Sequence, residues 1–190
     1  MTLEILTPPT VEPLSLDDAK AHSRQDPGTI EDSLILGFVK SARAQVETYL
    51  RRKLIDQTLR LSLSCFFSRI ALPAGPVRSL ALLTYLDNDG VRQTLAASEY
   101  RLVKIDGEAF VVPARDKDWP TALSDFASVQ VDFIAGYGPA ATDVPHDIVH
   151  AVRLLVAHYA ENREAIVIGT ISSDLPLGVI DLLAPHRRWV

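Results

Sequence analysis

The chain has 190 residues, of which 47% are hydrophobic and 23% charged, a composition typical of one globular domain. Its formal net charge of −5 argues against a protein that holds nucleic-acid phosphates over a broad face, although passing contact with DNA remains compatible with it. The single cysteine, Cys65, excludes an intramolecular disulfide, and no apolar run approaches the roughly 20 residues that span a bilayer, so we expect no membrane partner and no classical export signal.

The N-terminal part of the chain predicts an extended arm followed by a short helix. Residues 1–14 contain three prolines, which disfavour a helix. The segment Ser15-Leu-Asp-Asp18 then matches a capping box with Asp in place of Glu. We therefore predict a first helix that ends near Arg24.

A second, longer helix is predicted over residues 29–53. Apolar residues recur at helical spacing from Ile35 to Leu50, and we place Lys40, Arg43 and Glu47 on the opposite face. The basic triplet Arg51–Lys53 suits the C-terminal turn, because cations are favourable at the negative end of the helix macrodipole.

From about residue 55 to 136 the apolar period changes to two, which predicts a β-rich insertion that forms an antiparallel sheet or a small barrel. Asp87-Asn-Asp-Gly90 and, more strongly, Asp106-Gly107 are hairpin signals. Cys65 lies in the first alternating run and is interpreted as a small buried hydrophobe. The predicted strands are 59–65, 80–86, 91–95, 100–105, 108–112 and 129–135.

The C-terminal part predicts helices again. Asp143 as a cap and Pro145 in the first turn begin a helix over 145–163, and Asp174 begins a last short helix over about 175–183. An apolar segment without a clear period, 165–173, lies between them.

The predicted fold class is α+β, with all 190 residues in a single domain. Helices within 15–53 and 143–184, including long ones near 29–53 and 145–163, form a bundle that carries the β-rich insertion. The tail, residues 185–190, is interpreted as a docking segment because Arg and Trp are common interface anchors. Its candidate contact residues are Arg187, Arg188 and Trp189.

Two motifs suggest other functions. His146-Asp-Ile-Val-His150 is similar to the zinc motif H-E-x-x-H, with two histidines one helical turn apart, but no third ligand is indicated. A metal-dependent hydrolase is therefore one alternative.

Gly136–Ala141 formally matches a dinucleotide fingerprint, but Pro139 removes a donor and the predicted helix begins too late to meet a pyrophosphate.

A nucleic-acid-binding module is the other alternative. Its cationic residues would be Arg51, Arg52, Lys53, Arg187 and Arg188. The motifs supply no catalytic residue, no cofactor site and no complete metal site, so we do not expect an enzyme.

Short segments spread over nearly the whole chain, in this order and spacing, carry a resemblance to a known family. They are Pro8-Pro9, Val11–Pro13, Leu16–Lys20, Arg51–Ile55, Gly136–Gly138, Val144-Pro145, Leu154–Tyr159, Glu161–Ala165 and Leu175–Val179. Together they resemble the head–tail connector (adaptor) proteins of tailed bacteriophages, which also occur in prophages and phage-like gene transfer agents.

The resemblance implies a structural protein that is made in the bacterial cytoplasm and assembled at the head–tail junction of a virion or phage-like particle. Such connectors form a ring of about twelve copies beneath the portal and join the DNA-filled head to the tail. The implied partners are the portal protein, neighbouring copies of the chain and a tail-proximal stopper or tail protein. DNA passes through the ring without sequence-specific binding, and the C-terminal segment reaches into the portal.

Overall fold

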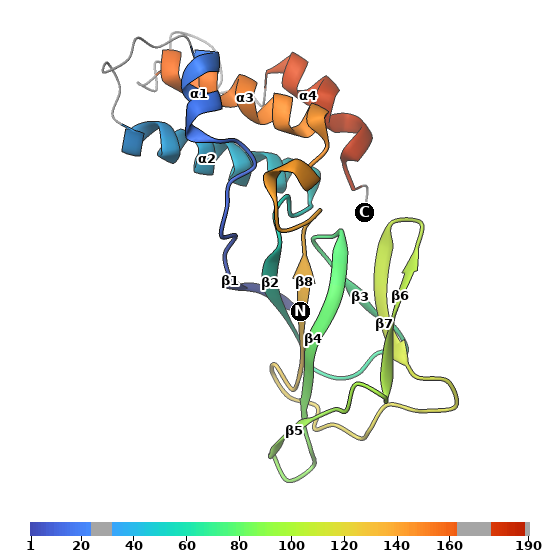
Figure 1. The fold of residues 1–190 in the computed structure, drawn as a ribbon. Coiled ribbons are helices and arrows are strands. Elements are labelled where there is room, and N and C mark those ends of the chain that lie inside the picture. The colour runs from blue at the N-terminus through green and yellow to red at the C-terminus, as the bar shows by residue number, and fades with distance from the viewer. Residues whose placement is uncertain (24–31, 163–175, 189–190) are drawn as a thin grey trace, which may run out of the picture. The chain divides into compact units, whose positions relative to one another are not determined.

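The computed structural model describes residues 1–23, 32–162 and 176–188. The chain forms two compact units, and each is described by itself (Figure 1). The β unit consists of Met1–Pro9 and Asp56–Tyr137, and the helical unit consists of Thr10–Ile55 and Gly138–Val190. The predicted start of the second helix near residue 29, the apolar segment 165–173 and the Asp174 cap all lie outside the described residues.

The β unit contains two antiparallel sheets. The five-stranded sheet has the order β1 (Thr2–Thr7), β2 (Gln57–Leu63), β8 (Val129–Ala135), β4 (Val77–Leu86) and β5 (Arg92–Thr94). The three-stranded sheet has the order β3 (Ile70–Leu72), β7 (Glu108–Pro113) and β6 (Tyr100–Ile105). The antiparallel arrangement predicted from the period of two is confirmed.

Both predicted hairpins form. Ile105 pairs with Glu108, and the two residues between them, Asp106 and Gly107, have φ values of 50° and 78°, as a type I′ turn requires. In the β4–β5 hairpin the Asp87 carboxylate accepts hydrogen bonds from the Gln93 side chain and from backbone N–H groups in the turn, and these bonds lower the pKa of Asp87.

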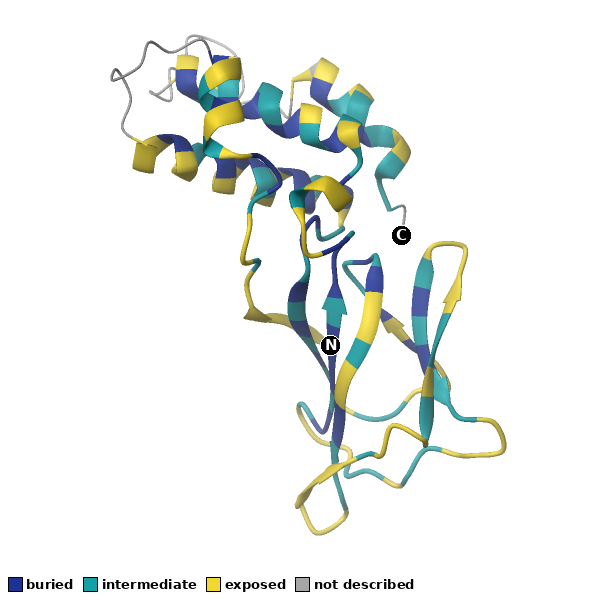
Figure 2. Cartoon of the chain, viewed as in Figure 1, coloured by how far each residue is buried: buried dark blue, intermediate teal, exposed yellow. Residues whose placement is uncertain are grey.

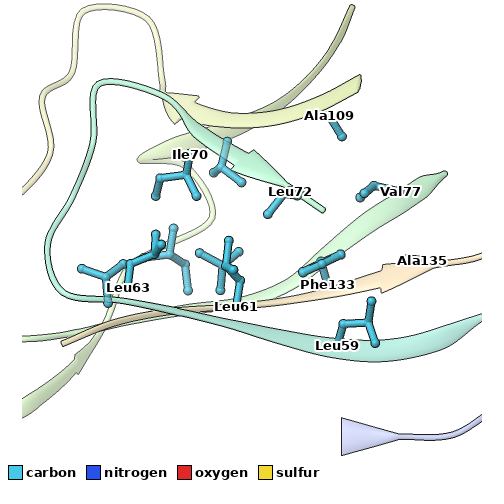
Figure 3. Close-up of a cluster of buried hydrophobic side chains, with 13 residues drawn as sticks. Leu59, Leu61, Leu63, Ile70, Leu72, Val77, Ala109, Phe133 and Ala135 are labelled. Atoms are coloured by element: carbon cyan, nitrogen blue, oxygen red, sulfur yellow. The ribbon is translucent and has the colours of Figure 1, made fainter. Parts of the chain in front are cut away.

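The core of the β unit lies between the two sheets. Alternate residues of β2, β4 and β8 point toward β3 and β7, and Figure 3 shows their side chains meeting. The buried cluster consists of Leu59, Leu61, Leu63, Ile70, Leu72, Val77, Leu83, Ala109, Val111, Val129, Val131, Phe133 and Ala135. On the other face of β2, Arg60 forms a bidentate salt bridge with Asp132, in which Nε and Nη2 each donate to one carboxylate oxygen at 2.7 Å. This hydrogen bonding raises the pKa of Arg60.

Three details of the β unit differ from the sequence prediction. The N-terminal arm is a strand, β1, whose six residues are all exposed (Figure 2), and β3 was not predicted. The strand β2 ends at Leu63, so Cys65 lies in the following loop and is only half-buried. The alternation in the sequence continues to Cys65, but pairing of β2 ends at Leu63. The prediction of a buried Cys65 fails because alternation alone does not show where strand pairing stops.

Within the described residues the helical unit contains four α-helices, shown in Figure 1: α1 (Leu16–Ser23), α2 (Asp32–Leu50), α3 (His146–Glu161) and α4 (Leu177–Leu183). Ser15 caps α1 as predicted, because its Oγ accepts the Asp18 N–H at 3.1 Å. The reciprocal half of the predicted capping box differs, since the Asp18 carboxylate accepts from Ser15 Oγ at 2.8 Å and not from the Ser15 N–H. Apolar residues at helical spacing line the buried faces of α2 and α3, among them Val39, Val46, Val152 and Leu155 (Figure 2).

The α+β class is confirmed, whereas the description as a bundle with two long helices is not. The helices α2 and α3 have 19 and 16 residues, and α1 and α4 have 8 and 7. No helix among the residues described is both long and apolar enough to cross a lipid bilayer.

The start of α3 also differs from the prediction. Asp143 does not cap this helix, because its carboxylate accepts the Ala140 N–H at 2.9 Å within the 3-10 turn η1 (Ala141–Asp143). Pro145, with an extended ψ of 138°, occupies the N-cap position, and the helix begins at His146.

Candidate functional site

The helix α2 ends at Leu50, and the next residue lies in the left-handed backbone region. Arg51 has a φ of 55°, its N–H donates to the Thr48 carbonyl at 3.3 Å, and the Arg52 N–H donates to the Glu47 carbonyl at 3.2 Å. This pair of bonds is the Schellman pattern, which usually places glycine at the left-handed position. The chain therefore turns sharply after Leu50 and leaves two arginines at the helix end.

The residues that follow α4 return to this end of α2. They begin with the 3-10 turn η2 (Ala184–His186). The Arg188 N–H donates a hydrogen bond to the Leu50 carbonyl at 3.0 Å, and Arg52 Nε donates to the His186 carbonyl at 2.8 Å. His186 Nε2 lies 2.5 Å from a carboxylate oxygen of Asp147 in α3. The segment 184–188 is thus held against both α2 and α3.

These contacts bring two arginine pairs to the same end of α2, and we call these four residues the arginine cluster: Arg51, Arg52, Arg187 and Arg188. The Arg187 guanidinium carbon lies 4.7 Å from the centre of the Tyr49 ring, a cation–π contact. Burial lowers the pKa of Arg188, and the positive charges of Arg52 and Arg51 lower it further. The cluster therefore concentrates positive charge at one end of α2, and the side chains of Arg52 and Arg187 are held by contacts within the unit.

The third member of the basic triplet, Lys53, belongs to a different group of charges. Lys53 Nζ lies 2.9 Å from the Glu47 carboxylate, which also accepts the Leu54 N–H at 3.1 Å and forms an ion pair with Arg43 at 3.4 Å. Of the three charged residues placed opposite the apolar face, Lys40 is exposed, but Arg43 is half-buried and Glu47 is only 5% exposed, so that face is not polar and solvated throughout. The chain after the α2 turn returns to this side of the helix, and the carboxylate takes the place of water as the acceptor for the Leu54 N–H.

The histidines of the zinc-like motif do not form a metal centre in the part of the chain that the structure describes. His146 and His150 are both exposed on α3, and the His150 ring lies near that of His22, with ring centres 6.3 Å apart. No group of three or more His, Cys, Asp or Glu side chains within the described ranges could hold a metal ion. The structure gives the hydrolase alternative no support.

Sequence reasoning identified Arg187 and Arg188 but missed the residues that position them. Tyr49 was assigned to the apolar face of α2, and no pattern connects Asp147 with His186, because the two lie 39 positions apart on different elements. The other predicted tail residue, Trp189, lies outside the described residues.

No family model and no curated protein matches this sequence. Solved structures match it over its whole length. A chain in the neck of an empty gene transfer agent particle computed with C6 symmetry is 27% identical with a TM-score of 0.82, and one in the virion of the native particle is 28% identical with a TM-score of 0.81. A third, in the neck of the native particle computed with C12 symmetry, is 26% identical with a TM-score of 0.76.

Each of these matches covers 100% of this chain and 97% of the other. The likeness therefore extends over both units rather than over one common motif. It confirms the resemblance that the sequence motifs indicated: the whole chain is similar to neck components of gene transfer agent particles, in keeping with the head–tail connector family.

Proposed function

We propose that this protein is a structural head–tail connector subunit located at the neck of a phage-like particle. The observation that carries the proposal is the likeness to neck chains over the full length at TM-scores of 0.76–0.82. The motifs of the resemblance, from Pro8-Pro9 to Leu175–Val179, point to the same family independently of the fold. In this proposal residues 1–190 act as one connector subunit that includes both compact units.

The subunit works by assembly rather than by chemistry. The similar necks were computed with C6 and C12 symmetry, which supports a ring of about twelve copies for this chain as well. In such a ring each copy presents one surface to the next copy and a different surface to the previous one, and the rotation closes the contact. A closed ring around the genome path leaves a channel through which DNA passes without sequence-specific binding.

The ring joins the portal above it to a stopper or tail protein below it, and the C-terminal tail docks on the portal. Of the three candidate contact residues of this tail, Arg187 and Arg188 are described and Trp189 is not. The Arg187 side chain stacks on Tyr49 and the Arg188 backbone is bonded to Leu50, which favours this role because a segment that is already ordered loses less entropy on binding.

No separate observation favours the two alternatives. The histidine pair lacks a third ligand within the described residues. The nucleic-acid-binding module would use the basic triplet as a unit, but Lys53 is engaged by the buried Glu47. The similar proteins are structural parts of a particle, which agrees with a role that is not enzymatic.

The proposal is tested by electron microscopy of the full-length chain mixed with the portal protein of the same particle. We expect a ring of this chain, coaxial with the portal and attached to one end of it. A truncated chain that ends at His186 serves as the comparison, and circular dichroism establishes whether it is folded. A folded truncation should fail to attach, and failure of the full-length chain to attach to any portal would contradict the connector function.

A further inference from the structure

The arginine cluster combines two arginine pairs that are remote in the sequence. Arg51 and Arg52 follow α2, whereas Arg187 and Arg188 follow α4, and the Arg188 N–H bond to the Leu50 carbonyl joins the two segments. The sequence therefore shows two separate dipeptides, and only the fold makes them one surface of the helical unit.

The positive charges of the two pairs act on one another across this contact. Burial is the main cause of the lowered pKa of Arg188, and the charges of Arg52 and Arg51 lower it further. Nearby cations are neutralised inside the unit, because Lys53 pairs with Glu47 and Arg43 pairs with Glu12 at 2.7 Å. Within the described ranges neither Arg51 nor Arg52 forms an ion pair with a carboxylate.

The cluster is also ordered in advance. Arg52 is fixed by the His186 carbonyl, Arg187 stacks on Tyr49, and His186 is itself held by Asp147. A guanidinium that is already fixed presents its fork of donors at a defined angle, which suits the two oxygens of a carboxylate. Stacked and hydrogen-bonded arginines are typical of protein interfaces, whereas binding along a nucleic-acid backbone relies on many mobile cations and is opposed here by the net charge of −5.

We propose that the arginine cluster is a preformed site for a carboxylate-bearing segment of a partner protein. The inference builds on the proposed function, which supplies a protein partner at the neck, and it names the chemistry that this partner must present. Arg51 and Arg52 bind the carboxylates together with Arg187 and Arg188, so the docking surface is composite and is not confined to the C-terminal tail.

The test uses two fluorescent probes of matched charge, an oligoglutamate peptide and a thymidine oligonucleotide, with the full-length chain and fluorescence anisotropy as the readout. Two variants are compared with the wild type: the double substitution Arg51→Glu with Arg52→Glu, and Arg51→Glu alone. The single substitution disturbs the fold less, because Arg51 is exposed. Lys40→Glu is the matched control. Lys40 is an exposed cation on α2, the helix that Arg51 follows, and replacing it with glutamate changes the net charge by the same amount as Arg51→Glu. Melting curves confirm that each protein is folded.

We expect the peptide to bind the wild-type chain, with affinity reduced about tenfold or more by Arg51→Glu and unchanged by Lys40→Glu. Equal weakening by Lys40→Glu would show that only net charge matters and would overturn the site. Tighter binding of the oligonucleotide, weakened by the same variants, would assign the cluster to phosphates instead. Absence of peptide binding by a chain that still attaches to the portal would overturn this inference and leave the connector function intact.

Discussion

Glu47 shows how a single side chain connects the end of a helix to the chain that follows it. Its carboxylate is buried and accepts the Leu54 N–H, while Lys53 and Arg43 supply the compensating positive charge. A buried carboxylate is tolerated only when it is paired and hydrogen-bonded in this way. Glu47 therefore contributes to the same turn that positions Arg51 and Arg52.

Replacing Glu47 with glutamine should destabilise the protein by about 2–4 kcal/mol, because it keeps the volume of the side chain but leaves two half-buried cations without their shared anion. Urea unfolding at neutral pH measures the change. Glu161→Gln, at an exposed position on α3, is the control and should change the free energy of unfolding by less than about 0.5 kcal/mol. Equal stability of the two variants would contradict the role assigned to Glu47.

The contact between Asp147 and His186 gives the C-terminal segment a dependence on pH. Burial raises the pKa of the Asp147 carboxyl, but the hydrogen bond and the charge of His186, together with backbone hydrogen bonds such as that from the Ile148 N–H, lower it by more, so the folded-state pKa lies below the ordinary value. A carboxyl of this kind stabilises the fold above its unfolded pKa of about 3.9, and the contribution is lost as the pH falls through the folded value.

Asp147→Asn should therefore be less stable than the wild type at about pH 6, and the difference should shrink toward about pH 3. Urea unfolding at both pH values measures this. A difference that stays the same at both pH values would show that Asp147 acts through something other than its charge. His186→Asn, which removes the other half of the contact, should also lower the stability at about pH 6.

At the scale of the elements, the connection that leads into α3 is constrained by close packing. A Cβ atom on Gly138 would lie 2.1 Å from Asp143 Oδ2 and 2.6 Å from Asp143 Cβ. Asp143 cannot simply move away, since its carboxylate also accepts the Ala140 N–H. The glycine is needed here because another side chain occupies the space, and this close approach fixes the turn η1 before α3.

Gly138→Ala should accordingly destabilise the protein by about 1–3 kcal/mol, the usual effect of forcing an extra methyl group into a packed site. Gly37→Ala is the matched control: Gly37 lies inside α2, a Cβ there would have nothing within 4 Å, and alanine is the better helix former, so this variant should gain about 0.5–1 kcal/mol. Thermal unfolding of the two variants decides the matter. If Gly138→Ala were as stable as Gly37→Ala, the packing argument would be wrong.

At the scale of the whole molecule, each unit has buried residues of its own. The β unit is stabilised by the cluster between its sheets, and the helical unit by the apolar faces of its helices. Leu3, Ile5 and Leu6 are exposed together on the edge strand β1. The large apolar side chains that are more than half exposed in the described ranges, other than Met1, lie on separate segments: Phe67, Val91, Ile105 and Phe126. Scattered exposed side chains of this kind are normal for a monomer.

We therefore predict that the isolated chain is monomeric or weakly associating and forms its ring only on the portal. Light scattering over a range of concentrations measures this, with a mixture of chain and portal as the comparison. The physical reason is repetition: in a ring each contact is made many times, so a weak single contact is enough once the portal has gathered the copies. A tight, salt-resistant small oligomer of the chain alone at micromolar concentration would contradict the prediction.

Features that depend on a few neighbouring residues could be predicted from the sequence. The Ser15 cap of α1, the positive-φ turn at Asp106-Gly107 and the alternation of β8 formed as predicted. Each follows from local backbone geometry or from the period of one element, and so can be predicted without knowing what packs against it. The two arginine dipeptides of the candidate site are visible in the sequence for the same reason.

Contacts between distant segments could not be predicted from the sequence. The strand β1 exists because Thr2–Thr7 pairs with β2, and Glu47 is buried because the chain beyond α2 returns to it. The arginine cluster forms because the Arg188 N–H reaches the Leu50 carbonyl, a contact that no periodicity encodes. Pairing and burial of this kind depend on long-range packing, which is set by the whole chain and which a local pattern carries no information about.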